Sequence, residues 1–179
     1  EFSKSIYCKL KMIRPFKVNI PSSRLKEIIA KVENYPWSLM PNMKNWEHGT
    51  NKNYLKELCD YWIKNFKWKK YEKLINNFTN FKTTVEDIEI HFIQEKGSGP
   101  NPKPLLLMHG WPGSIVEFLE IIKPLAHPEN YGGKAEDAFT VIVPSLPGFG
   151  FSSSPKIPIG PRKIAKILDK MMTENLNFK

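Results

Sequence analysis

The segment 105–114, LLLMHGWPGS, constrains the fold of this chain of 179 residues more than any other. An apolar run over 104–108 leads into a turn with two glycines and a proline, and a helical pattern follows at once. A run without internal polar residues predicts a strand that is buried on both faces of a parallel sheet. Ser114 and Glu117 have the spacing of a capping box, which predicts that a helix begins directly after the turn. Functional loops of open α/β sheets lie at the carboxyl ends of strands, and backbone N–H groups in such a turn suit the stabilisation of a developing negative oxygen.

The rest of the chain divides into a helical first half and a second half in which strands and helices alternate. Helical spacing of apolar residues and period-two alternation distinguish the two kinds of element. We expect a helix capped by Ser22 or Ser23 that ends before Pro36, and a last helix with Pro161 in its first turn. The other expected helices are about 53–66, 68–78 and 114–125, and the expected strands are 15–20, 81–85, 88–92, 104–108 and 139–143. This order predicts the beginning of an α/β sheet.

The charge balance is basic, with 27 Lys and Arg against 18 Asp and Glu and a formal net charge of +9. Only Arg14, Arg24 and Arg162 are arginines, whereas nucleic-acid sites usually depend on arginine forks, so we expect no nucleic-acid partner. The segment 66–71, FKWKKY, interleaves basic and aromatic residues, but its helical spacing favours an amphipathic helix with solvated lysines. Dispersed lysines indicate a solubilising surface or attraction to an anionic membrane.

The cysteines and histidines predict neither a disulfide framework nor a metal site. Cys8 and Cys59 are the only cysteines, which favours a reducing compartment. His48, His91 and His127 show no ligand spacing among themselves or with carboxylates, and His91, inside a strand pattern, is expected to be a packed or surface residue. We therefore expect no metal and no cofactor.

Both ends of the chain suggest a segment of a longer protein. Residue 1 is Glu and not Met, and the last residues continue a helical pattern. No apolar run is long enough to span a membrane, and no signal peptide is evident. The basic residues Lys4, Lys9, Lys11 and Arg14 either form a solvated tail or border a membrane anchor that precedes them.

Several motifs together resemble the microsomal epoxide hydrolase family, which has the α/β-hydrolase fold and includes the juvenile hormone epoxide hydrolases of insects. They are HGWPGS at 109–114, PSLPGFGFS at 144–152, RPF at 14–16, YL at 54–55, YW at 61–62, WKK at 68–70, FKT at 81–83 and IHFI at 90–93. The resemblance extends from about residue 13 to residue 178. It implies a mainly helical N-terminal region over 1–79 and the first part of an α/β-hydrolase core over 80–179, which stops before the nucleophile elbow.

The resemblance also implies a reaction in which an Asp attacks a lipophilic epoxide and the resulting ester is hydrolysed by water to a vicinal diol. Trp111 would give a backbone N–H to the oxyanion hole, and its side chain could pack at the same time. His109, Gly110 and Pro112 would shape the turn, with a cis Trp111–Pro112 peptide and a purely structural His109. The nucleophile, the catalytic His and its acid would lie beyond Lys179, so we expect this chain to be inactive alone. The family further implies an endoplasmic reticulum or microsomal membrane location for the longer protein.

Other interpretations remain open at this point. The chain could belong to a different α/β-hydrolase, such as a haloalkane dehalogenase or an esterase. The family that it resembles has an Asp-Trp-Gly nucleophile elbow, so an Asp-Trp-Gly after residue 179 would support the resemblance and a Gly-x-Ser-x-Gly would overturn it. It could also be a non-catalytic basic module that docks on a partner or a membrane. Gly148 and Gly150 are expected to be turn glycines and not catalytic groups. An unfinished sheet exposes a strand edge, so we expect the isolated chain to be marginally stable or to aggregate.

Overall fold

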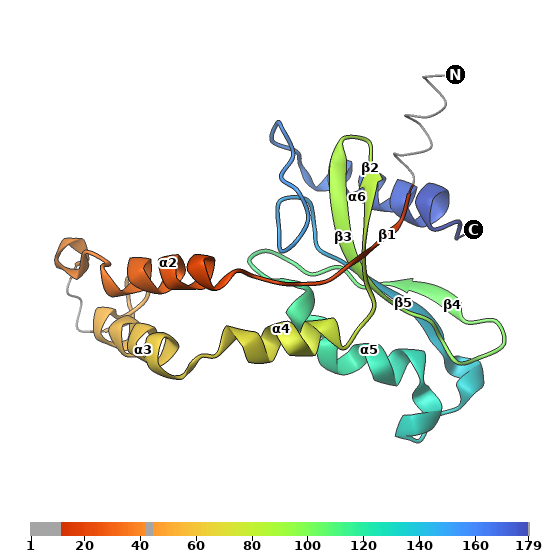
Figure 1. Cartoon of the computed structure of the whole chain (residues 1–179), viewed down its shortest axis with the longest axis horizontal. Helices are drawn as coiled ribbons and strands as arrows, with labels where there is room; N and C mark the ends of the chain where they lie inside the picture. The colour runs from red at the N-terminus through yellow and green to blue at the C-terminus, as the bar shows by residue number, and fades with distance from the viewer. Residues whose placement is uncertain (1–11, 42–44, 179) are drawn as a thin grey trace. The chain divides into compact units, whose positions relative to one another are not determined.

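A computed structural model of the chain describes residues 12–41 and 45–178 (Figure 1). The described residues form two compact units. Residues 12–17 and 74–178 make up the sheet unit, and residues 18–73 make up the helical unit. Each unit is described by itself below. The domain boundary between residues 79 and 80 that the resemblance implies stays a prediction.

The sheet unit is built on a mixed sheet of five strands. The strands are β1 (Arg14–Phe16), β2 (Asn80–Val85), β3 (Ile88–Glu95), β4 (Lys103–Leu106) and β5 (Phe139–Pro144). Their order in the sheet is β1-β2-β3-β5-β4, with β4 and β5 parallel and every other pair antiparallel. The expected strands 81–85 and 88–92 thus pair as a hairpin, and the predicted α/β class is confirmed.

Burial differs between the two parallel strands because of their places in the sheet. β5 lies between β3 and β4, and its residues from Thr140 to Pro144 are buried. β4 pairs only with β5 among the described strands; Lys103 and Pro104 are exposed, and Leu105 and Leu106 are half-buried. The prediction that 104–108 is buried on both faces is therefore wrong for this chain, because an edge strand has neighbours on one side only.

Helices cover the sheet on both faces. The 3-10 turn η2 (Ile115–Phe118) leads into α5 (Leu119–Ala126), which contacts β3 and β5. On the other side of the sheet in Figure 1 lie α6 (Pro161–Lys170) and the π-helical turn η5 (Met171–Asn175). A core cluster joins α6 and η5 to the hairpin and β5; its buried members are Val85, Ile88, Ile90, Phe92, Ile142, Ile167, Leu168 and Met171. Pro161 occupies the first turn of α6, as predicted.

The first strand is shorter than its alternating pattern predicts. Only Arg14–Phe16 pairs with β2, from Arg14 opposite Lys82 to Phe16 opposite Asn80. No strand among residues 12–41 and 45–178 pairs with residues 17–20, so the expected strand 15–20 is wrong over most of its length. Alternation of side chains is not sufficient for a strand where no neighbouring backbone completes the hydrogen bonds.

The helical unit contains α2 (Ser22–Glu33), the 3-10 turn η1 (Trp37–Leu39), α3 (Lys52–Asn65) and most of α4 (Trp68–Asn76). The predicted capping of the first helix by Ser22 or Ser23 is wrong, since Pro21 is its N-cap and no side chain caps it. Asn51 caps α3 and accepts from the N–H groups of Asn53 and Tyr54.

No residue of α2 or α3 is buried, although both helices are amphipathic. Tyr54, Leu58 and Tyr61 follow one another at helical spacing on α3, and between 49% and 60% of each residue is exposed. The segment 66–71 has the amphipathic arrangement that was predicted, with Phe66 stacked on Tyr71 and exposed lysines. These three side chains of α3 are thus left largely uncovered by the described residues.

Candidate functional site

The turn 109–114 and the loop 145–153 lie at the same edge of the sheet. β4 and β5 are parallel, with Leu105 opposite Val141 and Leu106 opposite Ile142, so their carboxyl ends coincide. The N–H of Leu107 donates to the carbonyl of Ile142 at 2.9 Å and extends this pairing by one residue. The position at the carboxyl ends of parallel strands is the one expected for a functional loop.

The turn itself is closed by the N–H of Gly113, which donates to the carbonyl of Gly110 at 2.8 Å. The Trp111–Pro112 peptide is cis, as the resemblance implied. Trp111 is 84% exposed, so the interpretation that its side chain packs is wrong for the described residues. What the turn holds in a defined position is therefore the Trp111 backbone.

The predicted capping box is present at the start of the following helix. Ser114 Oγ accepts from the N–H of Val116 at 3.3 Å, and the Glu117 carboxylate accepts from the N–H of Ser114 at 3.0 Å. The first turn is 3-10 and α5 follows it, whereas the sequence predicted one continuous helix over 114–125.

Within residues 12–41 and 45–178, the N–H of Trp111 makes no hydrogen bond. By contrast, the N–H groups of Gly113, Ser114 and Val116 each donate a hydrogen bond.

His109 is almost fully buried and both of its ring nitrogens are engaged. Nδ1 lies 3.0 Å from the carbonyl oxygen of Gly110, and Nε2 accepts from the N–H of Leu146 at 3.1 Å. Since a carbonyl only accepts and an amide N–H only donates, the ring is neutral with the proton on Nδ1. The ring also packs edge-on against Phe149, with centroids 5.5 Å apart. Through these two hydrogen bonds, His109 connects the turn 109–114 to the loop 145–153.

The loop after β5 turns sharply at two glycines. Gly148 and Gly150 have φ values of +84° and +52°, which confirms them as turn glycines. A Cβ at Gly150 would lie 2.6 Å from Ser145 Oγ, so the loop also approaches its own start closely at this point.

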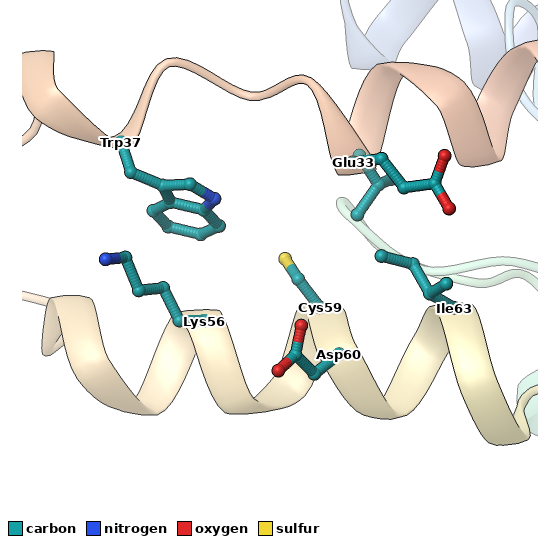
Figure 2. A pocket seen from close by; sticks show the side chains of 7 residues that line it. Glu33, Trp37, Lys56, Cys59, Asp60 and Ile63 are labelled. Atoms are coloured by element: carbon teal, nitrogen blue, oxygen red, sulfur yellow. The ribbon is translucent and has the colours of Figure 1, made fainter.

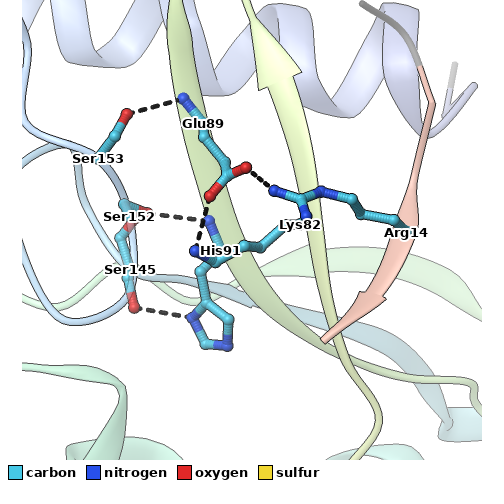
Figure 3. Close-up of polar contacts among 7 residues, drawn as sticks. All are labelled: Arg14, Lys82, Glu89, His91, Ser145, Ser152 and Ser153. Atoms are coloured by element: carbon cyan, nitrogen blue, oxygen red, sulfur yellow. Dashed lines mark hydrogen bonds and ion pairs between the residues drawn. The ribbon is translucent and has the colours of Figure 1, made fainter. Parts of the chain in front are cut away.

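His91 is the polar group near this edge whose importance the sequence did not reveal. It is fully buried, with Nε2 at 3.0 Å from Asn80 Oδ1. Its Nδ1 lies 2.9 Å from Ser145 Oγ (Figure 3). Burial, with a smaller contribution from the charge of Lys82, lowers the pKa of His91 to about 3. The strand pattern placed Ile90 and Phe92 on the core face and His91 on the opposite face, but gave no sign of what covers that face.

A cavity of about 280 Å³ lies in the helical unit, between α2 and α3 (Figure 2). Its lining consists of Val32, Glu33, Trp37, Lys56, Cys59, Asp60 and Ile63. The Lys56 ammonium lies 5.7 Å from the centre of the Trp37 ring, so a cation of the protein already faces that ring. None of the site residues predicted from the sequence lines this cavity.

Within the part of the chain that the structure describes, no three His, Cys, Asp or Glu residues are grouped to hold a metal ion. The same residues include no helix that is both long and apolar enough for a membrane span. Cys8 and the basic residues Lys4, Lys9 and Lys11 lie outside the described residues.

The strand–turn–helix arrangement and the mixed sheet define the α/β-hydrolase fold, whose family model matches residues 103–177. A second model, described as the epoxide hydrolase N terminus, matches residues 13–118. The chain therefore belongs to the epoxide hydrolase family, as the motifs predicted.

Known relatives agree with this assignment. The chain is 41% identical to a putative epoxide hydrolase of Stigmatella aurantiaca over 80% of its length, and 40% identical to epoxide hydrolase 1 of Oryctolagus cuniculus over 89%. The crystal structure of juvenile hormone epoxide hydrolase from the silkworm Bombyx mori superposes with a TM-score of 0.82 at 26% identity, over 99% of this chain and 42% of that one. The chain spans 32% and 36% of the lengths of the first two relatives, about a third in each case.

Proposed function

We propose that the protein to which this chain belongs is an epoxide hydrolase that converts lipophilic epoxides to vicinal diols with water and without a cofactor. The observation that carries the proposal is the turn 109–114, which lies at the carboxyl end of a parallel strand and holds a Trp111 N–H that is not bonded to any described residue. Membership of the epoxide hydrolase family supports the choice of substrate class.

In the proposed reaction, an Asp carboxylate beyond residue 179 attacks one epoxide carbon, and the C–O bond of the ring opens to an alkoxide that takes a proton from a tyrosine of a cap domain, also beyond residue 179. A His beyond residue 179 then removes a proton from water, which adds to the ester carbonyl. The oxygen that becomes negative in this second step accepts from the Trp111 N–H. On collapse of the tetrahedral intermediate the His returns its proton to the departing oxygen, which releases the diol. The carboxylic acid left on the Asp then loses its proton, which restores the carboxylate and replaces the proton that the alkoxide took up. His109, Gly110 and Pro112 hold the donor in place.

Because the proposed nucleophile and catalytic His lie beyond residue 179, we predict that residues 1–179 alone bind no epoxide covalently and catalyse no hydrolysis. The decisive test begins with the coding sequence downstream of Lys179. An Asp-Trp-Gly elbow followed by diol formation from a lipophilic epoxide, abolished by Asp→Asn at the elbow, supports the proposal. A Gly-x-Ser-x-Gly elbow with ester hydrolysis, or halide release from a haloalkane, replaces it with one of the alternative hydrolases. A stop codon at this point, with vesicle binding and no hydrolase activity, replaces it with a docking module.

We also propose that the longer protein is associated with the endoplasmic reticulum membrane through a segment that precedes this chain. The support is the family and the basic residues near the N-terminus. Arg14 itself forms an ion pair with Glu89 of the sheet unit, so it does not serve as a free membrane contact. Recovery of the complete protein in the membrane pellet after alkaline carbonate washing is expected; release into the supernatant would contradict this part of the proposal.

A further inference from the structure

The hydrogen bonds around His91 fix which of its ring nitrogens carries the proton. The Asn80 amide nitrogen donates to two carbonyls, that of Ile75 at 2.9 Å and that of Phe78 at 2.8 Å. The Asn80 oxygen therefore faces His91 Nε2 and can only accept, so Nε2 carries the proton. In the neutral ring Nδ1 must accept, and the Ser145 hydroxyl donates to it.

The backbone of His91 holds the same loop as its side chain does. Its carbonyl accepts from the N–H of Ser145 at 2.8 Å, and its N–H donates to Ser152 Oγ at 2.9 Å. The Ser152 hydroxyl in turn donates to the carbonyl of Ser145 at 2.7 Å. Figure 3 shows Ser145 and Ser152 side by side against the strand that carries His91. The beginning and the end of the loop are thus joined to one residue of β3.

The position of Ser145 is transmitted directly to the candidate oxyanion turn. The next residue, Leu146, donates its N–H to Nε2 of His109. His109 Nδ1 bonds the carbonyl of Gly110, whose peptide carries the Trp111 N–H. A shift of Ser145 therefore moves the N–H of Leu146, which is the hydrogen-bond donor to Nε2 of His109.

The aromatic surroundings of His91 explain why the ring cannot move independently of the strand. Phe16 of β1 and Phe151 of the loop pack against the imidazole at centroid distances of 5.3 and 5.1 Å. Lys82, whose charge acts on the ring, and Arg14 are both paired with Glu89. The ring is held by apolar neighbours and by two neutral hydrogen bonds, so its orientation is fixed. Because it is fully buried, it has no contact with solvent through which to transfer a proton.

We propose that His91 is a positioning residue for epoxide hydrolysis: by accepting the Ser145 hydroxyl it holds Leu146, and through His109 it holds the Trp111 N–H where the ester oxyanion forms. The proposal rests on the proposed function. It assigns to a buried residue of β3 an effect on the second chemical step, although His91 itself touches no substrate.

Three substitutions in the complete protein test this inference. His91→Asn keeps an acceptor near the Nδ1 position for Ser145 and loses the bond to Asn80. His91→Gln keeps a donor near the Nε2 position for Asn80 and loses the bond from Ser145. His91→Asn and His91→Gln lose the same contacts with Phe16 and Phe151, so a difference between the two variants reports on the hydrogen bonds and not on packing. Ser145→Ala removes the hydroxyl while the ring stays, and Ser153→Ala is the control, since Ser153 Oγ accepts from the N–H of Glu89 on the same strand but not from His91.

The measurements are single-turnover rates of ester formation and of ester hydrolysis, which do not depend on the fraction of protein that folds. Removal of an oxyanion-hole donor lowers rates by about 10²–10³-fold, so its displacement is expected to slow ester hydrolysis by about tenfold in His91→Gln and Ser145→Ala. Ester formation is unchanged, and kcat and KM fall together because the ester accumulates. His91→Asn and Ser153→Ala remain near the wild-type rate.

A purely structural role predicts a different result. It lowers the active fraction equally in His91→Asn and His91→Gln and leaves both single-turnover rates and KM unchanged, which would overturn the inference. So would a normal hydrolysis rate in Ser145→Ala. The failure of the proposed function is seen separately, because the wild-type protein would then form neither ester nor diol.

Discussion

Gly113 shows how one missing side-chain atom lets the candidate turn and the helix after it coexist. A Cβ at this position would lie 1.6 Å from Oε1 of Glu117, the oxygen that accepts from the N–H of Ser114. The capping box therefore occupies the space that any larger residue needs. At Gly110, by contrast, a Cβ would meet nothing within 4 Å. A side chain is therefore excluded by its neighbours at position 113 but not at position 110.

We predict that Gly113→Ala destabilises the complete protein by about 1–2 kcal/mol, since the Glu117 carboxylate must leave the N–H of Ser114 and a helix cap of this kind contributes about that much. Gly110→Ala is the matched control and is expected to change the free energy of unfolding much less. Urea denaturation of the three proteins gives the comparison. Equal stability of the two variants would show that the carboxylate finds another position without loss.

Buried neutral His91 also predicts a pH dependence of stability. Because its pKa is lowered to about 3 from the ordinary value of 6.5, the unfolded chain binds a proton between these pH values and the folded chain does not. His91 therefore contributes full stability above pH 6.5, and this contribution is lost as the pH falls from 6.5 towards 3, by up to about 1.4 kcal/mol per pH unit.

This expectation is checked by urea denaturation of wild type and His91→Gln at several pH values over that range. The wild type should lose stability more steeply than the variant on acidification. Parallel curves would mean that the proton binds equally in both states, so that His91 is charged inside the fold.

At the scale of elements, the hairpin is fastened to the helix that covers it. Glu86 lies in the turn between β2 and β3, with φ of +54°, and its carboxylate bonds Lys163 and Lys170 of α6 at 2.7 Å each. The hydrogen bond from Lys163, then that from Lys170, lowers the Glu86 pKa to about 2. Residues far apart in sequence thus fix α6 over the hairpin.

We predict that Glu86→Gln lowers stability by no more than about 1 kcal/mol, because these partners are partly exposed and solvent screens them. The loss should be seen above pH 4.5 and should disappear as the pH falls from about 4.5 to about 2, where the wild-type carboxylate takes up its proton. Asp87→Asn is the control, since Asp87 makes no hydrogen bond or ion pair with a described residue. Equal effects of the two substitutions, measured by thermal unfolding at low ionic strength, would argue against the contact.

At the scale of the whole molecule, the chain exposes two surfaces that complete proteins usually cover. β4 has a strand partner on one side only within the described residues. On α3, Tyr54, Leu58 and Tyr61 form an exposed apolar face. An unpaired strand edge and a continuous apolar helix face both favour self-association.

We therefore predict that residues 1–179, produced alone, elute as aggregates or as a mixture of sizes and unfold without a sharp transition. Tyr61→Lys should raise the monomer fraction if α3 is responsible, whereas it should have no effect if association occurs at β4. Light scattering coupled to size exclusion, with calorimetry, makes the measurement. A monomer that unfolds in one cooperative transition would refute the prediction.

Local sequence determined the features that are complete within a few residues. The capping box of Ser114 and Glu117, the positive φ of Gly148 and Gly150 and the Pro161 helix start each depend on neighbours in the chain. Hydrophobic periodicity likewise determined most of the elements, because burying one face of a helix or strand requires that spacing. The motifs were specific enough to indicate the epoxide hydrolase family, and the comparisons confirmed it.

Tertiary structure alone decided which segments become neighbours. Residues 17–20 alternate like a strand but pair with no strand of the described residues, and the apolar run of β4 lies at an edge because β5 inserts between it and β3. His91 acquires its role from Asn80, Ser145 and Phe151, which are 11, 54 and 60 positions away in the sequence. Pairing and burial depend on such distant contacts, which leave no periodic signal in the chain, whereas a cap or a turn is fixed by residues that adjoin it.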